Sequence, residues 1–85
     1  MAEIRWNKLK NERLKKIRGV SFEEVLRFRF IGVQEHPKRE NQSILVFERN
    51  GYIWLVPFVP DGEGIFLKTL FQSRKHTRLY KKGEL

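Results

Sequence analysis

The sequence predicts an α+β fold: two N-terminal helices packed on a small antiparallel sheet of three or four strands, then a short C-terminal helix. Hydrophobic residues recur at helical spacing in the first 30 positions, whereas residues 43–71 contain apolar runs rich in β-branched and aromatic residues. The last 12 residues are basic and helix-like. This order of elements favours a sandwich with the helices on one face of the sheet.

The first helix is predicted over Lys8–Arg18. Asn7 is a suitable N-cap, and Gly19 can adopt the left-handed conformation that commonly ends a helix. Four apolar positions share one stripe at 3.6-residue spacing and are expected to face the core. These are Trp6, Leu9, Leu14 and Ile17.

The second helix is expected to begin at Ser21, where Glu24 three residues later completes a capping box. Val20 and Val25 occupy the two positions of a hydrophobic staple. The side chains expected to face inward from this helix are Phe22, Val25, Leu26 and Phe30.

A β-hairpin is predicted from Ser43–Arg49 and Tyr52–Val59, joined by Asn50-Gly51, a dipeptide that favours a tight type I′ turn. The turn fixes the register and places Phe47 opposite Trp54. The other expected pairs are Arg49 with Tyr52, Leu45 with Val56 and Val46 with Leu55. Both faces of the hairpin are apolar, so it should be central and covered on both sides. Pro57 predicts an edge or a bulge at its far end.

Three further elements complete the prediction. After the turn at Asp61-Gly62-Glu63-Gly64, Ile65–Phe71 reads as a strand that places Lys68 on the same face as Phe66 and Leu70. Val33–His36 reads as a short edge strand. Ser73 is expected to cap a basic helix over Arg74–Lys82.

Length and composition narrow the class of protein. Eighty-five residues support one domain, 1–85, with a modest core that a partner could stabilise. The absence of cysteine excludes a disulfide framework, a cysteine zinc site and a thiol nucleophile. His36 and His76 have no partner at ligand spacing, so we expect no metal and no cofactor. The charged start and the lack of about 18 consecutive apolar residues predict a cytoplasmic protein without membrane contact.

The net charge of +8 is concentrated at the two ends of the chain. Residues 1–20 carry seven bases and two acids, and residues 66–85 carry six bases and one acid. The middle is slightly acidic, with five bases and seven acids in residues 21–65. If both ends pack on one side, they create a positive field that attracts polyanions such as RNA.

Several short motifs resemble a known family. Trp6-Asn7, Lys10-Asn11 and Gly19-Val20-Ser21-Phe22-Glu23-Glu24 resemble the opening of the BrnT family of toxins. Leu55-Val56-Pro57-Phe58-Val59, Ile65-Phe66-Leu67-Lys68-Thr69 and Ser73-Arg74-Lys75 are similar to small proteins usually described as toxins of this kind. The chain departs from the pattern at Arg18, where many members have His, and at Asn7, where Asp is common.

The resemblance implies a RelE-like fold and a ribonuclease that arrests translation. It also implies the toxin half of a bacterial toxin–antitoxin pair, held in a hetero-oligomeric complex by a cognate antitoxin that often has a ribbon-helix-helix DNA-binding part. The match to the family's Ser-Arg motif makes Arg74 the first candidate for binding the reacting phosphate.

Cleavage of RNA by its own 2′-hydroxyl requires a base, an acid and positive charge for the phosphorane. Arg74 at the start of a helix is the first candidate for that charge, followed by Lys68. His76 and Tyr80 are candidates for proton transfer, although a surface histidine and a packed tyrosine are the ordinary interpretations. Glu24 is occupied by its capping box, which argues against a catalytic pair with Glu23.

The expected RNA-binding residues are Trp6, Lys10, Arg49, Lys75 and Arg78. The leading hypothesis is a single basic cleft formed by Lys10, Arg49, Lys68, Arg74 and Arg78. Two alternatives remain open at this point. One is a non-catalytic RNA-binding or ribosome-associated module, and the other is a protein whose basic face docks an acidic partner.

Overall fold

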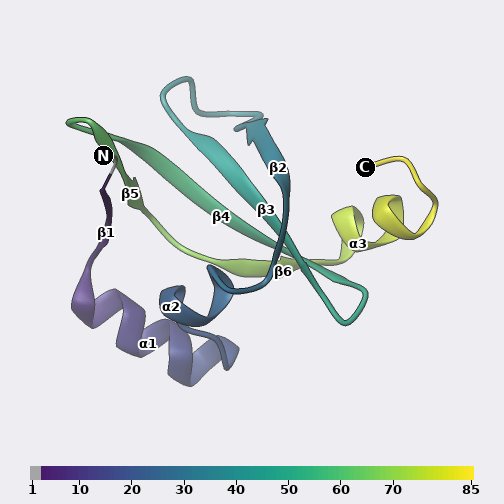
Figure 1. Ribbon diagram of the computed structural model, residues 1–85, viewed down its shortest axis with the longest axis horizontal. Coiled ribbons are helices and arrows are strands. Elements are labelled where there is room, and N and C mark those ends of the chain that lie inside the picture. The colour runs from purple at the N-terminus through teal and green to yellow at the C-terminus, as the bar shows by residue number, and fades with distance from the viewer. Residues whose placement is uncertain (1–2) are drawn as a thin grey trace.

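The computed structural model describes residues 3–85 and contains one sheet with helices on both sides (Figure 1). Within this range there are six strands and three helices. In chain order they are β1 (Ile4–Trp6), α1 (Lys8–Arg18), α2 (Phe22–Val25), β2 (Arg29–Glu35), β3 (Ser43–Arg49), β4 (Tyr52–Asp61), β5 (Gly64–Leu67), β6 (Phe71–Ser73) and α3 (Arg74–Lys81).

The sheet is larger than predicted and is mixed. Its strand order is β1-β5-β4-β3-β2, with β6 also paired to β4, and β1 runs parallel to β5. The expectation of three or four antiparallel strands is therefore wrong. β1 was not predicted, because a strand of three residues is too short to show an alternating pattern of apolar and polar residues. The strand expected over residues 65–71 is divided at residues 68–70, so that β5 and β6 pair with different parts of β4.

β1 can join the sheet because Gly64 leaves room for it. The Glu3 carbonyl accepts the Ile65 backbone N–H at 2.8 Å, and a Cβ atom at Gly64 would overlap the Glu3 backbone. Gly64, which the sequence places in a turn, is thus required for the parallel pairing of β1 with β5, two segments that are far apart in the chain.

The central hairpin has the predicted register. Phe47 pairs with Trp54 and Arg49 with Tyr52, and the remaining expected pairs are also confirmed. Asn50 and Gly51 both have positive φ, at 52° and 84°, as the type I′ turn requires.

Pro57 lies inside β4 rather than at the end of the hairpin. Its position is tolerated because β4 pairs with β6 over Ile53–Leu55 and with β5 over Phe58–Asp61, which leaves Pro57 between the two pairings. Its carbonyl accepts the Lys68 N–H at 2.8 Å, while the N–H that proline lacks is not needed there.

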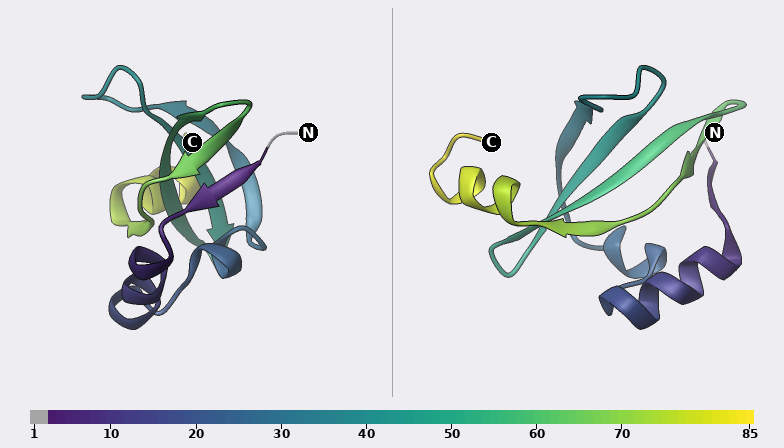
Figure 2. Two further views of the ribbon diagram at one scale, coloured as in Figure 1. Left: turned by 90° about the vertical axis from the view of Figure 1, so that its left-hand side faces the viewer. Right: turned by 180° about the vertical axis from the view of Figure 1, so that it is seen from behind.

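Both faces of the sheet are covered, but by different helices (Figure 2). The expectation of helices on one face is corrected, because α3 packs on the face opposite α1 and α2. Beneath α1 and α2, the main cluster contains Leu14, Val20, Phe22, Val25, Phe47, Trp54, Val56, Leu67 and Leu70. On the other face, Ile44, Val46, Ile53 and Leu55 are covered by Ile31, Phe71, Tyr80 and Leu85.

α1 has the predicted bounds and caps, but it is rotated relative to the predicted stripe. Leu14 is buried, whereas Leu9 and Ile17 are 73% and 65% exposed. The buried polar residue Asn11 takes the place beside Leu14 on the inner face. The hydrophobic pattern predicted the helix correctly and its orientation wrongly, because a hydrogen-bonded Asn was not counted as an inward-facing residue.

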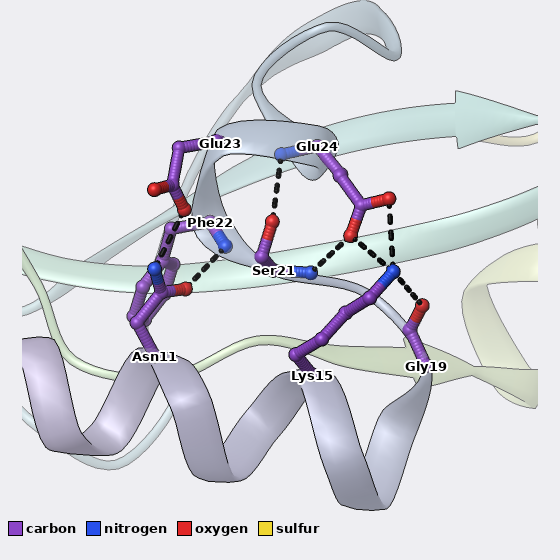
Figure 3. Close-up of polar contacts among 7 residues, drawn as sticks. All are labelled: Asn11, Lys15, Gly19, Ser21, Phe22, Glu23 and Glu24. Carbon is purple, nitrogen blue, oxygen red and sulfur yellow. Dashed lines mark hydrogen bonds and ion pairs between the residues drawn. The ribbon is translucent and has the colours of Figure 1, made fainter.

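The junction between α1 and α2 is held by polar contacts (Figure 3). The Asn11 side-chain oxygen accepts the Phe22 N–H at 2.7 Å, and its amide donates to Glu23 at 2.6 Å. Ser21 and Glu24 form the predicted capping box. Lys15 adds an ion pair to Glu24 at 2.8 Å.

α2 is only one turn long, and the chain then enters β2. Phe30 therefore belongs to a strand and is 56% exposed, so its predicted inward position on a helix is wrong. Of the edge strand predicted at Val33–His36, residues 33–35 form the end of this longer strand, and His36 follows it.

Candidate anion-binding surface

Hydrogen bonds within its N-terminal turn and to β4 hold α3 in place. Ser73 is the predicted N-cap, and its hydroxyl accepts the His76 backbone N–H at 3.1 Å. Thr77 is buried; its Oγ1 donates to the Ser73 carbonyl at 2.6 Å and accepts the Ile53 N–H at 2.8 Å. The helix is thus fixed against the middle of the sheet.

Residues of this helix and of β4 and β6 together line a shallow hollow with a volume of about 380 Å³, called here the α3 pocket. Arg74, Arg78 and Lys81 follow one another at helical spacings of four and three residues, which places them on one face. The lining residues are Tyr52, Gln72, Arg74, Thr77, Arg78 and Lys81.

Positive charge dominates the α3 pocket. Three of its lining residues are cationic, and none of the described lining residues is a carboxylate. The Lys81 ammonium lies 5.4 Å from the centre of the Tyr52 ring, a cation–π contact that holds the lysine over an exposed aromatic side chain. The arrangement favours binding of a phosphate beside a stacked base.

A second basic hollow, called here the α1 pocket, has a volume of about 480 Å³. It lies between the start of α1 and the end of β5, and Lys68 lies over the Phe66 ring at 5.7 Å. Its lining residues are Asn7, Leu9, Lys10, Arg13, Phe66 and Lys68.

The five cations of the predicted cleft do not share one pocket. Lys10 and Lys68 line the α1 pocket, whereas Arg74 and Arg78 line the α3 pocket. Arg49 lines neither; its guanidinium lies 4.8 Å from the centre of the Phe28 ring. α1 and α3 lie toward opposite ends of the long axis of the molecule (Figure 1).

His76 and Tyr80 lie on α3 but do not line its pocket. The His76 Nδ1 is 2.8 Å from Ser73 Oγ, and burial, with Lys75 as a lesser cause, lowers the pKa of His76 below 6.5. Tyr80 packs against the apolar cluster on the α3 face of the sheet. Lys75 is exposed on the same helix.

Trp6 is partly buried and packs against the main core cluster. Its ring centre lies 5.5 Å from that of Phe22. This contact corresponds to the alternative interpretation of Trp6 as a packing residue at the end of β1.

Sequence reasoning missed four residues of the α3 pocket: Tyr52, Gln72, Thr77 and Lys81. Helical spacing from Arg74 could have identified Thr77 and Lys81. Gln72 lies two residues before the helix, whereas Tyr52 is distant in sequence and is brought there by the pairing of β4 with β6.

Two kinds of feature were not found within residues 3–85. No helix in this range is long and apolar enough to cross a bilayer. No three side chains among its histidines and carboxylates gather in a group suited to holding a metal ion.

Comparisons with known proteins identify the fold. No family model matches the sequence, and no curated protein matches it. The crystal structure of the Brucella abortus ribonuclease toxin BrnT superposes with a TM-score of 0.58 at 20% sequence identity, covering 86% of this chain and 97% of that one. The resemblance expected from the sequence motifs is confirmed in three dimensions, and this chain has the fold of the BrnT toxin.

Proposed function

We propose that this chain is a toxin of a toxin–antitoxin pair and acts as a metal-independent ribonuclease that arrests translation in the cytoplasm. The observation that carries the proposal is a BrnT-like fold that presents an α3 pocket with three cations and no carboxylate among its described lining residues. The comparison structure is itself a ribonuclease toxin.

In this proposal the α3 pocket binds the scissile phosphate. Arg74 and Arg78 offer planar guanidinium donors, which suit the oxygens of a crowded phosphorane. Lys81 adds a third cation, and the Tyr52 hydroxyl, in the same pocket, is available for proton transfer, the role for which the sequence offers His76 and Tyr80 as candidates. His76 is a less suitable proton carrier, because Ser73 engages its Nδ1.

The proposed partner is an antitoxin that covers this cationic surface and forms a hetero-oligomer with the toxin. A ribbon-helix-helix DNA-binding part in the antitoxin would follow the pattern that the sequence resemblance implies. Acidic side chains on its toxin-binding segment would complement Arg74, Arg78 and Lys81.

One observation favours a second candidate function, a non-catalytic RNA-binding module. The described residues that line the α3 pocket include no histidine or carboxylate to act as general base. A binding module needs only the cations and the aromatic ring.

The test is incubation of the purified chain, free of any antitoxin, with total RNA in EDTA. We expect cleavage by the wild type and a loss of about 10²-fold or more in rate for Arg74→Ala, because one donor to the developing charge is removed. Arg27→Ala, which removes an exposed arginine that lines neither pocket, is the matched control.

The outcomes separate the candidates. Cleavage that survives Arg74→Ala would exclude the assigned phosphate site. Intact RNA that nevertheless binds the wild type more tightly than Arg74→Ala would favour the binding module. Intact RNA without binding would reject both.

A further inference from the structure

We propose that the α1 pocket is a second RNA-binding subsite, which holds the backbone of the same strand away from the α3 pocket. The inference rests on the proposed function and adds to it a bipartite mode of binding. It assigns a role to Arg13, which no sequence motif singled out, and to the Phe66 ring.

Three cations surround the α1 pocket from two elements. Lys10 and Arg13 are three residues apart on α1 and therefore lie on one side of that helix. Lys68, in the segment just after β5, lines the same hollow. Neither element alone would produce this concentration of charge.

These cations are not engaged by acids. The three side chains form no ion pair within residues 3–85, and no described residue that lines the pocket is a carboxylate. Lys15 on the same helix provides the contrast, because it pairs with Glu24 and thereby joins α1 to α2. The cations of the α1 pocket therefore have no acidic partner within residues 3–85.

The chemistry of the pocket favours a single-stranded nucleic acid over an acidic protein segment. An aromatic ring, Phe66, lies among the cations, and Leu9 is the single aliphatic side chain in the described lining. A nucleotide strand offers phosphates for the cations and a base for the ring. An acidic protein segment that buries its apolar side chains would need a larger aliphatic surface.

We infer that a strand long enough to span the molecule, and to pass from the α1 face of the sheet to the α3 face, can engage both pockets. The molecule measures 36 Å along its longest axis, and the helices that line the pockets lie toward opposite ends of it (Figure 1). A short strand can occupy one pocket, whereas a longer strand can occupy both and gains affinity through the effective concentration of its second half.

The experiment measures binding of fluorescent oligouridylates of about 4 and about 16 nucleotides across a salt series. We compare the wild type with Lys10→Ala/Lys68→Ala, and with Lys8→Ala/Lys38→Ala, which removes two exposed lysines outside both pockets. All four substituted side chains lie on the surface or at its edge, and thermal melts establish that each variant folds.

For the long oligonucleotide, the pocket variant should reduce the magnitude of the negative slope of log K against log salt by about 1.4, since each lost single-strand phosphate contact contributes about 0.7. The advantage of the long over the short oligonucleotide should shrink in this variant and persist in the lysine control. Arg13→Ala, which removes a single contact, should reduce the magnitude of the salt slope by less than the double variant does.

An unchanged slope and an unchanged length dependence in the pocket variant would overturn the inference. If Arg74→Ala still abolished RNA cleavage in that case, the proposed function would stand without the second subsite. If the pocket variant lost affinity for polyglutamate while its binding to RNA was unaffected, the pocket would be assigned to an acidic protein instead. A wild type that binds neither oligonucleotide would remove both proposals.

Discussion

The side-chain oxygen of Asn11 accepts the backbone N–H of Phe22 at 2.7 Å, so a residue of α1 satisfies the first turn of α2 (Figure 3). Asn11 is buried, and its amide nitrogen donates to Glu23. The motifs at residues 10–11 and 19–24, which resemble the BrnT family, therefore build a helix junction. Their presence reports on the fold, whereas the proposed activity rests on the cations of the α3 pocket.

Replacing Asn11 by Ala should lower the free energy of unfolding by about 1–3 kcal/mol, because the buried Phe22 N–H loses its acceptor. Urea denaturation measures the change. Asn41→Ala, at an exposed position, is the control and should stay within about 0.5 kcal/mol of the wild type. Equal urea midpoints for the two variants would show that the hydrogen bond between Asn11 and Phe22 does not stabilise the junction of α1 and α2.

The rotation of α1 predicts opposite results for two leucines on one helix. Leu14→Ala should cost about 2–5 kcal/mol, because Leu14 is only 1% exposed and its removal leaves a cavity. Leu9→Ala should change stability by less than about 0.5 kcal/mol. Thermal or urea unfolding of both variants checks the assignment, and a large loss in Leu9→Ala would contradict the observed orientation.

Thr77 connects α3 to β4 and should be sensitive to the loss of its hydroxyl. Thr77→Val keeps the shape but leaves the Ile53 N–H without an acceptor, which should cost about 1–3 kcal/mol. Thr77→Ser keeps the hydroxyl and should retain most of the hydrogen-bonding energy. Stability and RNA affinity should fall together in Thr77→Val, because α3 carries Arg74 and Arg78; full RNA affinity in a destabilised variant would mean that the pocket is preserved without this anchor.

The ion pair of Lys15 with Glu24 predicts a component of acid sensitivity. The Lys15 ammonium, helped by the Ser21 backbone N–H, lowers the pKa of Glu24 from 4.5 to about 2. Between these values the unfolded chain takes up the proton first, so this contribution is complete above pH 4.5 and is lost as the pH falls toward 2. The stability difference between the wild type and Glu24→Gln should shrink over that range.

Glu12→Gln is the control for this measurement, because Glu12 is exposed on α1 and makes no ion pair within residues 3–85. Its stability difference from the wild type should stay nearly constant with pH. If the stability difference from the wild type changed with pH equally in both variants, Glu24 would make no specific contribution to the loss of stability at low pH.

His76 should remain neutral in the folded protein at neutral pH. Burial, and secondarily Lys75, lowers the pKa of His76 below 6.5, so the stability that its neutral form contributes is complete above pH 6.5 and is lost as the pH falls below it. Titration of the imidazole by NMR should give a midpoint under 6.5 that rises in Lys75→Ala. A midpoint above 6.5 would require an anionic partner that is absent from the described surroundings.

Local features, which depend on neighbouring residues, are predictable from the residue types alone. Asn7 and Gly19 fixed the ends of α1, Ser21 and Glu24 fixed the start of α2, and Asn50-Gly51 fixed the register of β3 and β4. In each case a backbone group and its partner lie within a few residues, so the pattern of residue types was sufficient. The concentration of basic residues at the two chain ends also came from the sequence alone.

The tertiary structure decided what depends on distant segments. It paired β1 with β5 across some sixty residues, turned Leu9 and Ile17 toward solvent, and placed α3 on the opposite face from α1 and α2. It also separated the basic residues of one predicted cleft into two pockets. The physical reason is that burial, and with it the orientation of each element, is settled by the packing of the whole chain, which local spacing does not encode.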